Sequence, residues 1–357
     1  MGDALRVGLV GIGNISGQYL ATLPQLSGVS LVAAADLDPA REVPGVRMMT
    51  PASLYEADDV DLVLNLTIPR AHAEVALSAI AAGKHVYNEK PLALSTVEGR
   101  EVLSAASAAG VRVGCAPDTV LGTGIQTARR CIDDGMIGQP VAATAFMVTP
   151  GHERWHPAPE FYYQPGGGPL FDMGPYYLTA LVTLLGPVRR VAGMASTPRA
   201  ERVIGGGPRA GTAFPVAVST HVTGTLEHEN GALTTLLMSF DVWEAALPRM
   251  EVYGTAGSLS VPDPNNFAGE VQVFTPETAG RPDSGWTAVA PSAGHRNAGR
   301  GTGVADLASA LATNTEHRAN GTLAYHVLDI MESLLRATET GTTQDITSTT
   351  PRPAPVP

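Results

Sequence analysis

Short apolar runs alternate with longer amphipathic segments through the first third of the chain. Residues 5–10 and 29–35 are largely apolar runs followed by glycine or aspartate, which is typical of buried strands. Residues 71–82 and 95–110 carry apolar side chains at the 3.6-residue spacing of helices. Because strands and helices alternate, the pattern predicts an α/β domain with a doubly wound parallel sheet over residues 1–121.

The remainder of the chain, residues 122–357, has a different pattern. Apolar and polar residues alternate over 217–243 and 250–261, and a glycine-containing turn divides each stretch. This alternation predicts an antiparallel sheet with one face against helices and the other face polar or joined to another subunit. The tail, residues 349–357, contains four prolines and is expected to add nothing to the core.

A glycine pattern follows the first predicted strand directly. Gly11, Gly13 and Ser16 form the sequence G-x-G-x-x-S, in which Gly11 permits a tight turn and Gly13 lets the backbone approach a pyrophosphate. Asp36 ends the second predicted strand, where its carboxylate would bind ribose hydroxyls and repel a 2′-phosphate. The pattern predicts a Rossmann domain that binds NAD, with NADP less favoured although Arg41 lies nearby. The predicted cofactor-binding residues of this unit are Gly11, Gly13, Asn14, Ile15 and Asp36.

Composition narrows the class of protein. The chain has 357 residues, of which 44% are hydrophobic and 16% charged, enough for two domains with their own cores. Its net charge of −11 argues against nucleic acid or an anionic membrane as a partner. Two cysteines, Cys115 and Cys131, do not suggest a disulfide framework. No apolar run approaches the roughly 20 residues of a membrane span or forms a signal peptide, so a cytoplasmic location is expected.

Two further motifs carry chemistry. Lys90 lies in the sequence N-E-K-P at a predicted strand end, where parallel sheets present ligands, although a lysine there can equally be a solvated surface charge. The sequence GGGPLFDMGPYY opens an apolar helical stretch in which Pro175 suits the first turn. Asp172 and Tyr176 are four residues apart and would share one helix face. They can also be a helix cap and a core aromatic residue.

Together these motifs resemble the Gfo/Idh/MocA family, named after glucose-fructose oxidoreductase and inositol dehydrogenase. The resemblance covers nearly the whole chain. It implies a Rossmann domain followed by an α/β domain whose large, open, mostly antiparallel sheet mediates a homodimer or homotetramer. It also implies an NAD-dependent oxidoreductase that transfers hydride between nicotinamide and a secondary hydroxyl or carbonyl of a sugar, cyclitol or glycoside.

The resemblance assigns catalytic roles to Lys90, Asp172 and Tyr176. Lys90 would lie beside the nicotinamide and the substrate hydroxyl, and Asp172 matches the aspartate of the D-x-G-x-H signature. The histidine of that signature falls on Tyr176, whose phenol has an ordinary pKa near 10 against about 6.5 for imidazole. A neighbouring ammonium and the oxidised nicotinamide would stabilise a phenolate. Glucose-fructose oxidoreductase and the dimeric dihydrodiol dehydrogenases are similar in using Lys with Tyr, so Tyr176, or Lys90 through a shared network, is expected to accept the hydroxyl proton.

The resemblance also places the turn after the third strand, with the sequence NLTIPRAH, against the nicotinamide ribose. Its expected cofactor contacts are Thr67, Pro69, His72, Glu89 and Lys90. His72 can instead be a residue that merely begins its helix.

A competing motif lies at residues 152–156, where H-E-R-W-H matches the zinc-peptidase signature H-E-x-x-H. That chemistry needs both histidines on one helix face. Pro150 and Gly151 precede this segment and Pro157 and Pro159 follow it, which excludes the helix, so no metal is expected. Trp155 and His156 are predicted to bind substrate, because an indole packs on a pyranose face and an imidazole bonds its hydroxyls. The alternative is that they anchor the loop.

Three other functions stay open at this point. The enzyme can retain its cofactor and cycle between two substrates, or it can be a glycosidase that uses NAD transiently. A non-catalytic NAD(H)-binding sensor is a third possibility, because the family histidine is replaced.

Overall fold

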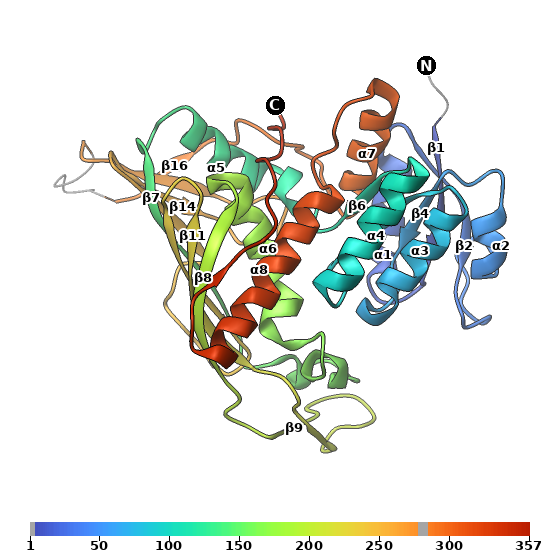
Figure 1. Cartoon of the computed structure of the whole chain (residues 1–357), viewed down its shortest axis with the longest axis horizontal. Helices are drawn as coiled ribbons and strands as arrows, with labels where there is room; N and C mark the ends of the chain where they lie inside the picture. The colour runs from blue at the N-terminus through green and yellow to red at the C-terminus, as the bar shows by residue number, and fades with distance from the viewer. Residues whose placement is uncertain (1–3, 278–284) are drawn as a thin grey trace. The chain divides into compact units, whose positions relative to one another are not determined.

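The computed structural model describes residues 4–277 and 285–357, which form two compact units (Figure 1). Of the described residues, the first unit contains 4–122 and 295–328, and the second contains 123–277, 285–294 and 329–357. The structure therefore groups 295–328 with the first unit, whereas the sequence-based division assigned that segment to the second domain.

The first unit is built on a parallel sheet of six strands with the order β3-β2-β1-β4-β5-β6. The strands are β1 (Leu5–Val10), β2 (Val29–Ala35), β3 (Arg47–Met49), β4 (Leu62–Asn65), β5 (His85–Asn88) and β6 (Val113–Cys115). This order confirms the predicted doubly wound parallel sheet. All strands run the same way, so their carboxyl ends, which carry the predicted cofactor residues, meet at one edge.

Helices cover both faces of this sheet and close two apolar cores. Helices α3 (His72–Ala81) and α4 (Thr96–Ala109) bury Ile80 and Val102 against one face. Tyr19 of α1 and Leu307 of α7 are buried against the other face. The helices on this second face are α1 (Ser16–Thr22) and α7 (Thr302–Thr313), and a short helix, α2 (Pro51–Glu56), precedes β4.

The second unit is built on a nine-stranded sheet with the order β16-β15-β14-β13-β7-β12-β11-β8-β17. Strands β7 and β12 run parallel, and the other neighbouring pairs in the described residues run antiparallel, which confirms the mostly antiparallel sheet. The strands are β7 (Pro140–Val148), β8 (Val188–Ser196), β11 (His221–His228), β12 (Leu233–Ser239), β13 (Met250–Gly254), β14 (Ser258–Val261), β15 (Val271–Phe274), β16 (Thr287–Val289) and β17 (Gln344–Asp345). A separate two-stranded ribbon joins β9 (Glu201–Val203) to β10 (Ala213–Pro215).

Helices α5 (Thr123–Asp133) and α6 (Gly168–Leu185) pack on one face of the nine-stranded sheet. The second half of α8 (Gly321–Thr340) joins this layer, where Leu334 packs against the paired glycines Gly193 and Gly224. In the part of the chain that is described, no helix combines the length and apolar character that a bilayer crossing requires.

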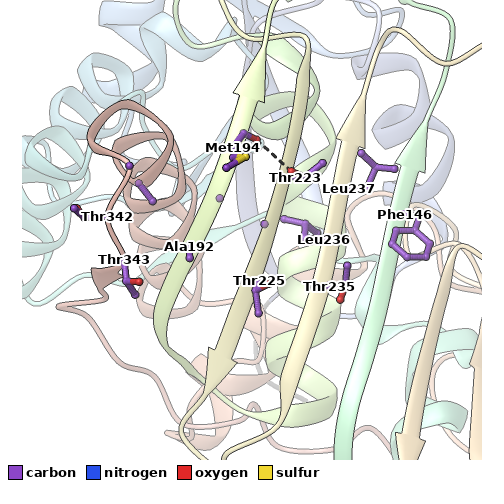
Figure 2. A pocket seen from close by; sticks show the side chains of 14 residues that line it. Phe146, Ala192, Met194, Thr223, Thr225, Thr235, Leu236, Leu237, Thr342 and Thr343 are labelled. Carbon is purple, nitrogen blue, oxygen red and sulfur yellow. Dashed lines mark hydrogen bonds between the residues drawn. The ribbon is translucent and has the colours of Figure 1, made fainter.

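The opposite face of the sheet carries a row of side chains on four neighbouring strands. Met194, Thr223, Leu237 and Phe146 are paired in register across β8, β11, β12 and β7 and line a groove of about 580 Å³ (Figure 2). Met194 is 79% exposed. This face therefore presents apolar side chains among threonines to the surroundings.

Two expectations about the second unit were wrong. Helix α6 begins at Gly168, so Pro169 occupies the first turn and Pro175 lies inside the helix. Asp172 is therefore an interior residue of α6 and not its cap. The proline-rich tail does add to the core, because Val356 is buried and its N–H donates to the Gln126 side chain (2.9 Å).

Candidate active site

The first half-site begins at the tight turn after β1. Gly11 has a φ of +98°, and its N–H donates to the carbonyl of Ala35 (2.9 Å). A Cβ on Gly11 would lie 2.8 Å from the backbone of Leu66 and Thr67, next to the end of β4. The turn thus requires glycine for its conformation and for its close approach to the neighbouring strand.

The residues after this turn form an open cradle of backbone amides. Within residues 4–277 and 285–357, the N–H groups of Gly13, Asn14 and Ile15 have no hydrogen-bond partner in the protein. A Cβ on Gly13 would meet no atom within 4 Å. Ser16, in place of the usual third glycine, is buried and donates to the carbonyl of Gly13 (2.7 Å). Free amides beside open space fit the pyrophosphate of a dinucleotide.

Asp36 is fixed at the end of β2 by two backbone groups. Its carboxylate accepts hydrogen bonds from the N–H of Ile12 (2.6 Å) and the N–H of Asp38 (2.9 Å). Arg41 donates to the carbonyl of Ile12 and lies 3.6 Å from the carboxylate of Asp38. A negative and a positive side chain therefore stand at the same edge of the cradle.

A buried polar network joins the ends of β4 and β5. The side-chain amide of Asn65 donates to the Asn88 side chain (3.0 Å), and the Thr67 hydroxyl donates to Asn65 (2.6 Å). Pro69 begins a short 3₁₀ helix, η2 (Pro69–Ala71), that leads into α3. Asn65 and Asn88 were not predicted as site residues, since an asparagine at a strand end carries no distinctive sequence signal.

His72 is an anchor between these two strand ends. It is 1% exposed, with Nδ1 2.6 Å from the carbonyl of Pro91 and Nε2 3.1 Å from the carbonyl of Thr67. Burial lowers the pKa of His72, and a neutral imidazole donates only one of these two hydrogen bonds. The ring is thus directed at the protein backbone; a direct contact with the cofactor stays a prediction.

Glu89 and Lys90 follow β5, and the peptide bond between Lys90 and Pro91 is cis. Glu89 is buried; its carboxylate accepts from the hydroxyl of Tyr19 (2.8 Å) and the N–H of Lys90 (2.9 Å). Burial raises the pKa of Tyr19 well above its usual value, so this hydroxyl stays a donor. Tyr19 and Glu89 thus fix the backbone that carries Lys90, whose side chain is half-buried. Tyr19 was not predicted as a site residue.

The second half-site centres on an ion pair between Asp172 and His152. Nε2 of His152 lies 2.9 Å from a carboxylate oxygen of Asp172, and each side chain is 14% exposed. Tyr176 follows Asp172 by one helical turn on α6 and is 5% exposed. His152 was noticed in the sequence only as part of the zinc-peptidase match; its pairing with a residue 20 positions away could not be deduced from spacing.

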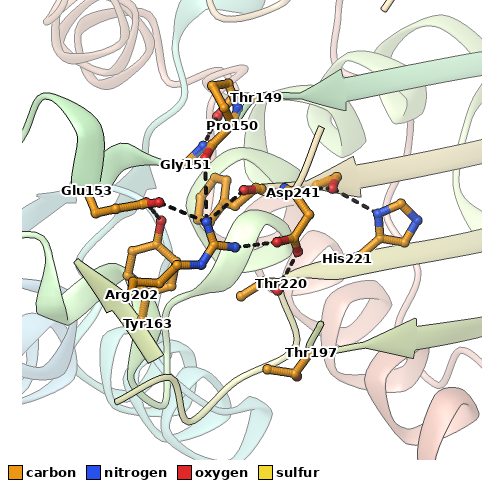
Figure 3. A network of polar contacts seen from close by, with 12 residues as sticks. Thr149, Pro150, Gly151, Glu153, Tyr163, Thr197, Arg202, Thr220, His221 and Asp241 are labelled. Atoms are coloured by element: carbon orange, nitrogen blue, oxygen red, sulfur yellow. Dashed lines mark hydrogen bonds and ion pairs between the residues drawn. The ribbon is translucent and has the colours of Figure 1, made fainter. Parts of the chain in front are cut away.

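A buried ionic network holds the loop that carries His152 (Figure 3). The guanidinium of Arg202, from β9, donates to Glu153 (2.8 Å) and to Asp241, and its side chain is 1% exposed. Tyr163 donates its hydroxyl to the other oxygen of Glu153, and Thr220 donates to Asp241 (2.6 Å). Because Glu153 is buried in this network, its neighbour His152 is held toward Asp172.

Aromatic rings surround His152 in this loop. Tyr162 and Phe240 lie 4.6 Å and 4.5 Å from the imidazole, measured between ring centroids, and Trp155 lies 5.4 Å away. Trp155 is 62% exposed. An exposed indole beside polar groups fits the apolar face of a sugar ring.

His156, the other predicted substrate contact, is 8% exposed. Its Nδ1 accepts from the N–H of Ala158 (3.1 Å), so Nε2 carries the proton of the neutral ring. Burial lowers the pKa of His156, which favours this neutral form. The ring is packed near Trp155 (5.3 Å), as both the substrate-contact and the loop-anchor hypotheses require.

The H-E-x-x-H segment has no zinc-peptidase geometry. It forms a three-residue 3₁₀ turn, η4 (His152–Arg154), and Glu153 is engaged by Arg202 and Tyr163. Across the described residues, no group of three or more His, Cys, Asp or Glu side chains is placed to hold a metal ion.

Comparison with known proteins gives matches along most of the chain. A family model described as the oxidoreductase family, NAD-binding Rossmann fold, matches residues 5–116, and the GFO/IDH/MocA C-terminal domain model matches residues 125–260. The chain is 29% identical to 1,5-anhydro-D-fructose reductase of Ensifer adhaerens over 71% of this chain and 74% of that enzyme. It is 36% identical to inositol 2-dehydrogenase of Klebsiella pneumoniae over 39% of this chain, a match that spans 44% of that enzyme.

A solved structure is also similar in fold. Levoglucosan dehydrogenase, in complex with NADH and levoglucosan, superposes with a TM-score of 0.80 at 21% identity and covers 97% of this chain and all of that one. At this level of identity the likeness concerns the fold.

Proposed function

The chain belongs to the GFO/IDH/MocA family of NAD-binding oxidoreductases, and on this premise we propose that it transfers hydride between NAD and a secondary hydroxyl or carbonyl of a sugar, cyclitol or glycoside. The observation that carries the proposal is the open cradle of free amides at Gly13, Asn14 and Ile15. When bound there, the nicotinamide cofactor supplies the hydride acceptor or donor. The protein supplies binding, orientation and proton transfer.

NAD is the proposed cofactor in preference to NADP. The carboxylate of Asp36 is held in place by the N–H groups of Ile12 and Asp38, where it would bind ribose hydroxyls and repel a 2′-phosphate. Thr67, Pro69, Glu89 and Lys90 are proposed to line the nicotinamide end. We expect NADH to bind more tightly than NADPH, and Asp36→Ser to narrow that difference in a fluorescence titration.

The second half-site is proposed to hold the substrate. Asp172 and Tyr176 would contact the reacting hydroxyl, and Trp155 and His156 would contact the sugar. The named relatives support a polyhydroxylated substrate, because their names specify an anhydro sugar and inositol.

The test is NADH absorbance at alkaline pH with cyclitols, aldoses, anhydro sugars and glycosides. We expect one of these classes to give turnover, and Lys90→Ala to lower kcat by roughly a hundredfold or more. Lys84→Ala is the matched control, because the Lys84 ammonium donates to the carbonyl of Ala57 (2.8 Å), away from the strand-end residues of the half-site. Tight NADH binding without turnover on any class would instead favour a sensor.

Two related activities are separated by the same assay. Cofactor that stays bound through dialysis would favour an enzyme that recycles NAD between two substrates. Glycoside cleavage without net NADH would favour an NAD-dependent glycosidase.

A second copy of the chain is the proposed occupant of the outer face of the nine-stranded sheet. The row of Met194, Thr223, Leu237 and Phe146 presents apolar surface on that face (Figure 2). We expect a dimer or tetramer by light scattering, and Leu237→Glu to shift it toward the monomer. Val203→Glu is the control, because Val203 is exposed (53%) on the separate β9–β10 ribbon.

A further inference from the structure

We propose that His152 is a catalytic residue of this enzyme: its Nδ1 accepts the proton of the substrate hydroxyl, and Asp172 holds the ring for that task. The proposal rests on the proposed dehydrogenase function and names its proton acceptor. It moves this step from the phenol of Tyr176 to an imidazole on another segment of the chain.

The contact with Asp172 sets which nitrogen of His152 carries the proton. An ionised carboxylate only accepts hydrogen bonds, so the 2.9 Å contact with Asp172 requires that Nε2 carry the hydrogen. Nδ1 of the neutral ring then keeps its lone pair. An imidazole with one N–H on a carboxylate and the other nitrogen free is the arrangement of a general base.

Nδ1 is also open to a ligand. Among the residues that the structure describes, Nδ1 of His152 has no hydrogen-bond partner. It does not belong to the fully buried side-chain atoms without a partner, so it is accessible from outside the protein. The side chain keeps 14% of its surface exposed. The ring centroid of the exposed Trp155 is 5.4 Å from that of the imidazole, so a small ligand on the indole would lie near the His152 ring.

The loop holds the ring in one orientation. Glu153 is locked by Arg202 and Tyr163, and the imidazole packs between Tyr162 and Phe240. A base that is fixed by packing and by a carboxylate needs little reorganisation when the substrate binds. A surface histidine without a function would not need this many contacts to hold its ring and its loop.

The chemistry of the two groups also favours His152 over Tyr176. A ring nitrogen without a hydrogen accepts a proton directly, whereas a phenol must first lose its own. Tyr176, at 5% exposure one turn from Asp172, would instead donate a hydrogen bond to the substrate oxygen.

The step is balanced with NAD as the oxidant. The carbinol C–H bond breaks and its hydrogen leaves with both electrons as hydride to the nicotinamide. The hydroxyl O–H bond breaks, its proton goes to Nδ1 of His152, and the C–O bond becomes a carbonyl. The imidazolium is balanced by Asp172 until the proton passes to water; reduction runs the same steps backward.

The kinetic test compares His152→Ala with His221→Asn, a substitution of another half-buried histidine of the same unit that the proposal does not use. We expect His152→Ala to lower kcat for oxidation by roughly 10²- to 10⁴-fold, with NADH affinity unchanged and the protein still folded. Added imidazole should restore part of the rate, and Tyr176→Phe should cost less than His152→Ala. A kcat of the His152→Ala variant within threefold of the wild-type value would overturn the proposal.

A second readout does not depend on turnover. In protein labelled with ¹⁵N-histidine, long-range ¹H–¹⁵N spectra distinguish the two tautomers, and His152→Gln assigns the signal. The proposal expects Nε2–H with unprotonated Nδ1, and Asp172→Asn should disturb that preference. A Nδ1–H tautomer in the wild type would overturn the role of His152 even if the enzyme is active. If no substrate reacts, the proposed function fails, and the catalytic role of His152 fails with it whatever the tautomer.

Discussion

The two half-sites are built from different materials. The proposed cofactor half-site consists mainly of backbone groups at strand ends: the turn at Gly11, the free amides after it and the segment around Lys90. The proposed substrate half-site consists of side chains, with His152 on a loop, Asp172 on α6 and Arg202 on β9. Its central contact joins residues 20 positions apart, and its anchor joins residues 49 positions apart.

This difference has a consequence for robustness. A backbone site survives most side-chain changes, because the sheet sets its geometry. A side-chain site depends on each member of its network, since a buried charge without its partner is costly. Substitutions in the two half-sites should therefore fail in different ways.

The largest effect is expected for Arg202→Ala. The substitution leaves the carboxylates of Glu153 and Asp241 buried without their cation, and breaking a buried ion pair from one side costs about 3–5 kcal/mol. Urea denaturation should show this loss of unfolding free energy, together with loss of turnover. Arg209→Ala is the control: Arg209 is half exposed and pairs with Glu160, so its removal should cost less than about 1 kcal/mol. Equal losses from both variants would show that the network does not support the loop.

Next in size is the pair Gly11→Ala and Gly13→Ala. At Gly11 the φ of +98° alone costs an alanine about 1–3 kcal/mol, and the new Cβ would clash with the backbone of Leu66 and Thr67. At Gly13 a methyl group meets open space, so stability should change by less than about 1 kcal/mol while NADH affinity falls. Thermal melting and fluorescence titration on both variants separate folding from binding. A Gly13→Ala protein with normal NADH affinity would contradict the proposal that the dinucleotide binds at this cradle of amides.

The same difference decides how much of the molecule could be predicted from its sequence. The cofactor half-site follows from local patterns: a strand of six residues, a glycine turn and an acid at the next strand end were predicted at the residues where the structure has them. The capping signal of α4 is equally local, with Ser95 accepting the N–H of Glu98 (3.2 Å). Each needs only a short stretch of chain.

The substrate half-site needed information that no short stretch contains. The pattern H-E-x-x-H has a local meaning in a helix, but here Glu153 is held by Arg202 from a distant strand, and the loop takes a different path. Pro175 is a first-turn signal by itself, yet Pro169 already occupies that place and α6 continues past both. Val356 is buried although its neighbours are prolines, because the tail packs on Gln126 of α5. In each case tertiary packing overrides the local preference.

A smaller effect is expected for Tyr19→Phe. Tyr19 is the place where the cofactor half-site depends on a contact between side chains. Tyr19 donates to Glu89 across 70 positions of the chain, and removing the hydroxyl leaves a buried carboxylate oxygen without this donor. The loss should be about 1–3 kcal/mol of unfolding free energy. If Glu89 positions Lys90 as proposed, kcat should fall more than NADH affinity does. Unchanged kcat with lower stability would limit Tyr19 to a folding role.

The smallest effect is a pH dependence of stability at His72. Burial lowers the pKa of His72 in the folded protein, whereas the unfolded chain titrates near 6.5. Below pH 6.5 the unfolded state therefore binds a proton at this imidazole that the folded state does not bind. Stability from this residue is present above about pH 6.5 and is lost as the pH falls toward the lowered pKa. The slope from one such group is at most about 1.4 kcal/mol per pH unit.

His72→Gln should remove that share of the slope between pH 6.5 and 5, measured by urea denaturation against the wild type. His228→Gln is the matched variant in the second unit, because burial also lowers the pKa of His228. Both substitutions should flatten the pH dependence. Only His72→Gln should also weaken NADH binding, since His72 lies against the carbonyls of Thr67 and Pro91 at the strand ends, while His228 lies against the carbonyl of Gly186. Equal NADH affinity in the two variants would mean that the backbone of the cofactor half-site keeps its geometry without this anchor.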